Sequence, residues 1–262
     1  MQLPTVERIR IYPIKSLDGA ERERAALVSG GCLAGDREFA IVDDEGEYVN
    51  GVRTDAVHGL TTAVDRDAGT VRIGERGADE RREFDLDDRT ALGDWLSDYF
   101  GFDVSVVRDE RGMPDRAAGG PTVVSTATLR EVASWFDGVT VEGVRRRFRT
   151  NVEVGGVPAF WEDRLYGPDD RRAFEVGDVR FEGDGPCGRC VVPTRDPDTG
   201  ERTEGFQETF VDRREATLPS WTPEERFDHF YKLTVSTRVS GPVEGASIAV
   251  GDTVRVLDDE AE

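Results

Sequence analysis

Alternation of apolar and polar residues predicts that the first hundred residues are mainly strands and turns. Val6–Tyr12 alternates apolar with charged residues up to Pro13, as a strand does. Two pairs of apolar segments flank acidic, glycine-containing turns and indicate hairpins, namely Phe39–Val42 with Tyr48–Val49 and Leu60–Val64 with Thr70–Ile73. Apolar residues between 92 and 99 recur at helical spacing before Gly101, so we expect one helix there and a short strand after it, at 103–107.

The second half of the chain follows a polar, glycine-rich stretch at 110–120, which predicts a domain boundary or a loop. We therefore expect two domains, residues 1–110 and 111–262. A helix over 129–136, capped by Ser125 or Thr126, is followed mostly by strand patterns, and aromatic residues at 221–231 indicate another helix. Two Gly-Asp turns between alternating apolar residues are typical of barrel strands. Together these patterns predict a β-rich α+β fold.

The chain is strongly acidic. Of its 262 residues, 54 are Asp or Glu and 34 are Lys or Arg, so the formal net charge is −20, and Lys15 and Lys232 are the only lysines. This charge repels nucleic acid and anionic lipid, so we expect neither as a partner. Two interpretations remain: an acidic interaction protein, or halophilic adaptation to a salty cytoplasm. At 1 M salt the electrostatic screening length falls to roughly 3 Å, so repulsion between the acidic side chains costs little. The even spread of acids favours the second.

No run approaches the roughly 20 apolar residues of a membrane span, and residues 1–7 show no signal-peptide pattern, so we expect a cytoplasmic protein without a membrane partner. Three cysteines cannot form a disulfide scaffold. A structural zinc site would need two ligands besides the only C-x-x-C pair, Cys187 and Cys190. A thiolate beside arginine is nevertheless a metal ligand and a nucleophile. A simple turn with one buried thiol and one exposed thiol explains that tetrapeptide equally well.

Four segments carry a resemblance to a known family. Cys187–Cys190, with Asp-Pro-Asp-Thr-Gly at 196–200, resembles the signature of the MOSC domain, named for the C-terminal domain of molybdenum cofactor sulfurase. Tyr12–Ser16 and Gly35–Val42 resemble the MOSC N-terminal β-barrel domain, and Phe148–Val152 resembles the Phe-Arg-x-Asn segment of the MOSC domain. The resemblance implies an N-terminal β-barrel-like domain followed by a β-barrel-containing MOSC domain. It is nearest to the mitochondrial amidoxime-reducing component and its bacterial relatives.

The resemblance also implies a cofactor and a site. Cys190 is then the catalytic residue and the protein ligand of molybdenum in the molybdenum cofactor (Mo-molybdopterin). The residues that match the family's cofactor contacts are Lys15, Ser16, Arg37, Arg149, Asn151, Gly188 and Arg189. The implied activity is an oxidoreductase that reduces N-hydroxylated or other N–O compounds, small molecules, with electrons from a separate donor protein, since no ferredoxin domain follows residue 257.

One turn departs from the family's pattern. The family usually has Asp or Ser/Thr before the strand that leads to Ser125, whereas this chain has Ala117-Ala118-Gly119-Gly120-Pro121. Either the amides of the two glycines take over, or the cofactor contact differs. The cationic run Arg145–Arg149 indicates an anion site or a solvated basic face, with Arg149 as the strongest candidate. We expect His58 and His229 to have packing or surface roles, and Asp198 to form a turn.

Two other functions remain open. A non-redox molybdenum cofactor or sulfur carrier would hold a persulfide on Cys190 or would deliver the cofactor to other enzymes. A small-molecule binding module would contain the C-x-x-C only incidentally. The resemblance favours the reductase over both, and the metal content of the purified protein would separate the three.

Overall fold

The computed structural model describes residues 3–115 and 119–257, and it confirms a strand-rich α+β fold. Ala117 and Ala118, in the turn that departs from the family's pattern, lie outside the described residues. The largest element is a mixed sheet whose strands, in spatial order, are β15 (Val254–Val256), β11 (Arg172–Val176), β12 (Val179–Gly188), β13 (Lys232–Val239), β9 (Val123–Ser125), β10 (Val152–Gly155), β1 (Thr5–Ile11) and β2 (Ala20–Arg22). β9 and β10 run parallel, and the other neighbours run antiparallel.

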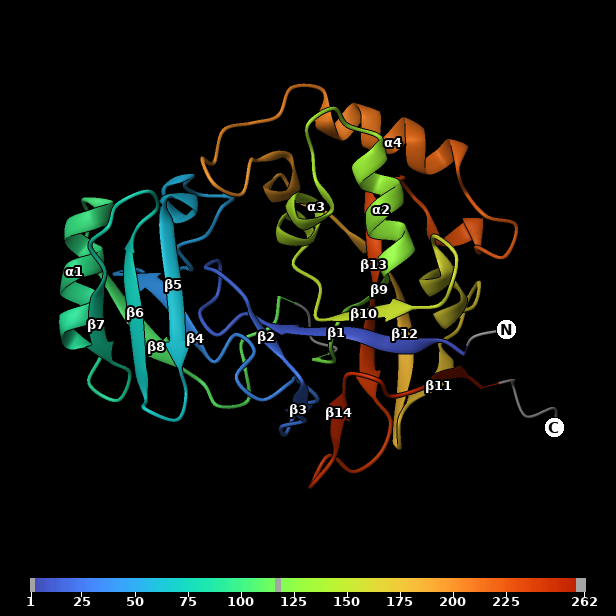
Figure 1. The fold of residues 1–262 in the computed structure, drawn as a ribbon, viewed down its shortest axis with the longest axis horizontal. Coiled ribbons are helices and arrows are strands. Elements are labelled where there is room, and N and C mark those ends of the chain that lie inside the picture. Colours follow the sequence, from blue (N-terminus) through green and yellow to red (C-terminus); the bar gives the residue numbers. More distant parts are fainter. Residues whose placement is uncertain (1–2, 116–118, 258–262) are drawn as a thin grey trace.

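β1 and β2 join the start of the chain to the sheet built from its second half (Figure 1). Ile9 of β1 lies opposite Val152 of β10, and both are almost fully buried in the main core with Phe181 and Val235. Burial of apolar side chains from both strands holds this pairing in register. The chain that leaves β1 is therefore placed beside residues far along the sequence.

β3 (Arg24–Ala26) pairs with β14 (Ser247–Ala249), and Ala25 and Ile248 are buried in the main core. Most of the rest of the first half forms two smaller sheets around a second core, namely β4 (Phe39–Asp43) with β8 (Val104–Arg108), and the hairpin strands β5 (Leu60–Asp65) and β6 (Thr70–Glu75) with β7 (Arg82–Asp85). Helix α1 (Thr90–Phe100) buries Leu92 and Leu96 in this core and ends at Gly101 with φ +77°, as predicted. The hairpin predicted over 39–49 is short, with a single bridge between Val42 and Tyr48, and the longer ladder of β4 is with β8.

Three helices lie over one side of the large sheet: α2 (Thr126–Ser134), α3 (Val141–Phe148) and α4 (Phe206–Ala216) (Figure 1). Ser125 caps α2 by accepting a 3.0 Å hydrogen bond from the Thr128 N–H, which confirms the predicted cap. The sequence pattern did not reveal α3 or α4. None of the helices in the described part of the chain combines the length and apolar character needed to cross a membrane.

The described residues also form four 3-10 helices: η1 (Ala56–Gly59), η2 (Trp161–Leu165), η3 (Val192–Thr194) and η4 (Glu224–Arg226). The helix predicted over 221–231 is wrong, since only η4 forms there, after Pro223. The chain after Cys190 forms η3, with Pro193 in its first turn.

Candidate functional site

A cavity of about 740 Å³ is lined by residues from both halves of the chain. Nine cationic side chains and three carboxylates lie in its described lining, although the whole chain has a formal net charge of −20. A concave surface enriched in one sign of charge concentrates ligands of the opposite sign. The cavity is therefore suited to an anionic ligand.

Every site residue predicted from the sequence lines this cavity. They are Lys15, Ser16, Arg37, Arg149, Asn151, Gly188, Arg189 and Cys190. Segments separated by more than 130 residues meet here because β1 pairs with β10 and α3 ends beside the loop after β1.

The three cysteines differ in exposure. Cys190 is exposed, Cys32 and Cys187 are buried, and no disulfide joins them. The Cys187 thiol lies 2.8 Å from the Ser236 hydroxyl. Burial, with the nearby Asp36 carboxylate, raises the pKa of Cys32 to about 11. Cys190 is therefore the thiol best placed to react or to bind a metal.

The loop after Cys190 is held by α3. The buried Arg147 guanidinium donates hydrogen bonds to the carbonyl oxygens of Pro193, at 3.0 Å, and of Arg195. Arg146 Nη1 donates a hydrogen bond to Asp198 Oδ1 at 2.8 Å. Asp198 thus pairs with α3 across the loop instead of capping the turn.

The turn itself is capped by Asp196. Its Oδ1 accepts hydrogen bonds from the main-chain N–H groups of Asp198, at 2.9 Å, and Thr199, at 3.1 Å. The expectation that Asp198 forms the turn therefore holds for the segment, but the side chain responsible is two residues earlier.

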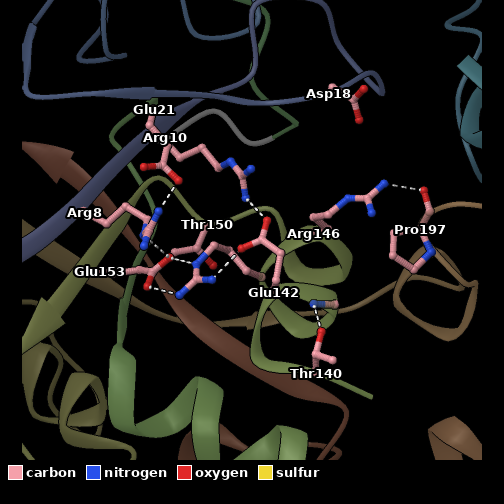
Figure 2. A network of polar contacts seen from close by, with 12 residues as sticks. Arg8, Arg10, Asp18, Glu21, Thr140, Glu142, Arg146, Thr150, Glu153 and Pro197 are labelled. Carbon is pink, nitrogen blue, oxygen red and sulfur yellow. Dashed lines mark hydrogen bonds and ion pairs between the residues drawn. The ribbon is translucent and has the colours of Figure 1, made fainter. Parts of the chain in front are cut away.

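The arginine run on α3 is not one basic face. Arg145 forms ion pairs with Glu142 and Glu153. Figure 2 shows these two carboxylates, which also pair with Arg10 and Arg8. Hydrogen bonds to Glu153 hold the pKa of Arg145 above its usual value. The first three arginines of the run thus already form ion pairs with carboxylates or donate hydrogen bonds to carbonyl oxygens.

Arg149 differs from them. Among the described residues it forms no ion pair, its Nη1 donates to the Leu17 carbonyl oxygen at 2.7 Å, and its buried Nη2 has no hydrogen-bond partner. The guanidinium lies 4.1 Å from the centroid of the Tyr12 ring. Burial lowers the pKa of Arg149 to about 10. A buried donor without an acceptor costs free energy, which a bound anion would recover.

Lys15, Ser16 and Arg37 lie in the turns that follow β1 and precede β4. Ser16 and Arg37 have φ of +73° and +52°, and Arg149 also has +52°. Left-handed backbone at a residue other than glycine costs on the order of 1 kcal/mol or more, and it recurs at functional sites. Arg37 forms an ion pair with Asp36, and its guanidinium lies 5.2 Å from the Tyr12 ring centroid.

Asn151 lines the cavity but uses its side chain to join strands. Its Oδ1 accepts from the N–H and the hydroxyl of Thr122, each at 3.1 Å, and its Nδ2 donates to the Arg10 carbonyl oxygen at 3.1 Å. Arg189 Nη2 donates to the Phe148 carbonyl oxygen at 2.5 Å. These contacts position the cavity wall.

Three residues of the cavity were not predicted as site residues, and His58, which was expected to have a packing or surface role, is one of them. Tyr12 lies beneath both Arg37 and Arg149, Asp115 pairs with Lys15, and His58 lines the wall between the two halves. Burial, together with the Arg195 and Arg149 charges, lowers the pKa of His58 to about 4. These roles depend on residues from distant segments, so no local pattern could indicate them.

The described residues include no cluster of three or more His, Cys, Asp or Glu that could hold a metal ion by itself. A metal held by Cys190 would therefore need other ligands from a non-protein group. The cavity combines one exposed thiol, several arginines and a lysine, which suits an anionic ligand that brings such ligands.

The chain is similar to two kinds of known protein. The chain is 25% identical to mitochondrial amidoxime reducing component 2 of Bos taurus, over 97% of this chain and 83% of that protein. It is 25% and 22% identical to the molybdenum cofactor sulfurases of Caenorhabditis elegans and Bos taurus, over 76% and 80% of this chain. It spans only about 30% of the length of those sulfurases.

The YUAD protein of Bacillus subtilis has a solved structure with 13% sequence identity and a TM-score of 0.39, covering 97% of this chain and 96% of that one. Residues 3–92 match the MOSC N-terminal beta barrel domain, and residues 118–255 match the MOSC domain. The chain belongs to the MOSC domain family and contains the N-terminal beta barrel domain as well.

Proposed function

We propose that the chain binds the molybdenum cofactor in this cavity and reduces N-hydroxylated or other N–O compounds with electrons from a separate donor protein. The observation that supports this most directly is the meeting of Cys190, Lys15 and Arg149 around one cavity. The similarity to the amidoxime reducing component supports the reaction class.

The donor set fits such a cofactor. A dithiolene supplies the sulfur ligands that a single protein thiolate lacks, and thiolate is a soft ligand suited to the metal. The phosphate end of the cofactor needs cations and hydrogen-bond donors, and Arg149 offers a buried donor without an acceptor.

In this proposal, Cys190 holds the metal and the cavity cations hold the phosphate. The cationic contacts are Lys15, Arg37, Arg149 and Arg189, and the polar or backbone contacts are Ser16, Asn151 and Gly188. When bound, the cofactor supplies the two-electron chemistry. Arg147 fixes the loop after Cys190, so that the thiol is presented in one orientation.

The molybdenum content of the purified protein tests this function. We expect about one metal per chain in the wild type and none in Cys190→Ser, whereas Cys187→Ser, which alters a buried thiol of the same turn, keeps the metal. Wild-type protein should then reduce an N-hydroxylated compound with a chemical reductant. Molybdenum retained by Cys190→Ser would remove Cys190 from the ligand role.

A sulfur or cofactor carrier is the second candidate, and the exposure of Cys190 supports it. Two relatives bear the name sulfurase. Intact-mass analysis separates the two functions, because a persulfide on Cys190 in metal-free protein favours the carrier.

A further inference from the structure

The ammonium group of Lys15 already has an anionic partner. Lys15 is buried, and its Nζ forms an ion pair with Asp115 and donates to the Met113 carbonyl oxygen at 3.0 Å. The Asp115 side chain is 73% exposed, so it is held mainly by charge rather than by packing. Both residues line the cavity.

Two further cavity cations act on the same carboxylate. Partial burial alone would raise the pKa of Asp115, but the hydrogen bond from Lys15 and the charges of Lys15, Arg37 and Arg149 hold it below its usual value. Asp115 is therefore ionised at neutral pH and faces the three cations on which the proposed phosphate site depends.

We propose that Asp115 is a resident carboxylate that occupies the anion site of the cavity in the ligand-free protein, and that a phosphate group must displace it to reach Lys15. This rests on the proposed function of the cavity. A tethered carboxylate is present at a high effective concentration, so every incoming anion meets the same competitor. Asp115 thereby sets the affinity that a ligand must exceed.

This threshold determines which anions occupy the site. The displacement cost is the same for each of them, so a monoanion that binds weakly falls below significant occupancy. A phosphate dianion can interact with several cations through different oxygens and stays above the threshold. Asp115 therefore keeps weakly binding monoanions out of the site at concentrations where phosphate still binds, although the ratio of their affinities is unchanged.

The other lysine of the chain provides a matched control. Lys232 Nζ also pairs with an exposed aspartate, Asp228, and donates to a carbonyl oxygen, that of Arg226, at 2.7 Å. A phenylalanine ring, Phe227, lies near Lys232 as Tyr48 lies near Lys15. Lys232 and Asp228 do not line the described cavity.

Calorimetric titration of cofactor-free protein with inorganic phosphate tests the proposal. We expect Asp115→Asn to bind phosphate at least ten-fold more tightly than the wild type, and Asp228→Asn to match the wild type. Acetate should compete with phosphate in Asp115→Asn at concentrations that have no effect on the wild type. Adding Arg149→Met to Asp115→Asn should abolish the gain, which assigns it to this cavity.

Equal phosphate affinity in wild type and Asp115→Asn overturns the role of Asp115, and if binding still depends on Arg149 the phosphate site itself stands. An equal gain in Asp228→Asn overturns the proposal too, since overall charge would then be the cause. Absence of phosphate binding in every variant overturns both the role of Asp115 and the phosphate site. The molybdenum content of the wild type reports separately on the proposed function. Melting temperatures show whether each variant is folded.

Discussion

Arg149 at the end of α3 donates a 2.7 Å hydrogen bond to the carbonyl oxygen of Leu17, in the loop after β1. The same guanidinium covers Tyr12 and keeps one buried nitrogen without a partner. A single side chain thus ties the two halves of the cavity together and still has a donor to offer a ligand.

Replacing Arg149 should therefore affect binding more than stability. Arg149→Met loses one hydrogen bond, worth about 1 kcal/mol, but it also removes a charge whose burial is unfavourable, as its lowered pKa shows. We expect phosphate affinity to fall at least ten-fold, and the unfolding free energy to change by no more than about 1 kcal/mol. Arg149→Lys, which keeps the charge, should retain part of the affinity. Unchanged affinity with a large loss of stability would assign Arg149 a purely structural role.

The thiols should react at different rates in the native protein. Cys190 is exposed, whereas Cys32 and Cys187 are buried, and the Cys32 pKa of about 11 leaves it almost entirely protonated at pH 8. Brief alkylation with iodoacetamide at pH 8, followed by peptide mass spectrometry, should label Cys190 first. Denatured protein, in which all three react, is the control. Rapid native labelling of Cys32 would contradict the buried position.

His58 should make the fold less stable in acid. Its native pKa of about 4 is below the usual value of 6.5, so the unfolded chain binds more protons between these values. The unfolding free energy should therefore decrease as the pH falls from about 6.5 to 4. Urea titrations of wild type and His58→Gln should show a smaller decrease in the variant. His229→Gln, at an exposed histidine, should follow the wild type. Identical pH profiles for wild type and His58→Gln would refute the low pKa.

The ion pair between Arg214 of α4 and Asp163 should contribute strongly to the stability of the fold. Arg214 is 1% exposed, and Asp163, which also accepts a 2.8 Å hydrogen bond from Thr222, is equally enclosed. Arg214→Met leaves a buried carboxylate without its cation, which costs about 3–5 kcal/mol. We expect the melting temperature to fall by roughly 10 °C.

Arg255→Met is the matched control for that measurement. Arg255 pairs with Glu175 at the surface, where an ion pair contributes about 1 kcal/mol or less. Equal melting temperatures for Arg214→Met and Arg255→Met would show that the buried pair is dispensable.

The sequence predicted elements well where one periodic pattern dominates. β5 with β6, α1 with its glycine end, and the Ser125 cap all follow from local spacing. It failed where tertiary contacts determine the conformation. α3 carries four arginines in nine positions with its cap, so its apolar face is narrow, and it is stabilised by ion pairs and carbonyl contacts that come from other segments.

The candidate site shows the same division. The eight site residues that match the family's contacts could be listed from the sequence, and all eight line one cavity. The hydrogen-bond and ion-pair partners of each residue could not be predicted, because those partners lie far along the chain. Asn151 is engaged by Thr122 and Arg10, whereas Arg149 is left without a carboxylate.

By itself, the sequence determined the strand-rich class, the acidic surface and the chemical types available at the site, because these depend on composition, periodicity and short motifs. Only the tertiary structure decided which thiol is exposed, that Arg149 has no carboxylate partner among the described residues, and which carboxylate faces Lys15. Those properties arise from burial and from charges brought together over more than a hundred residues, and no local pattern encodes them.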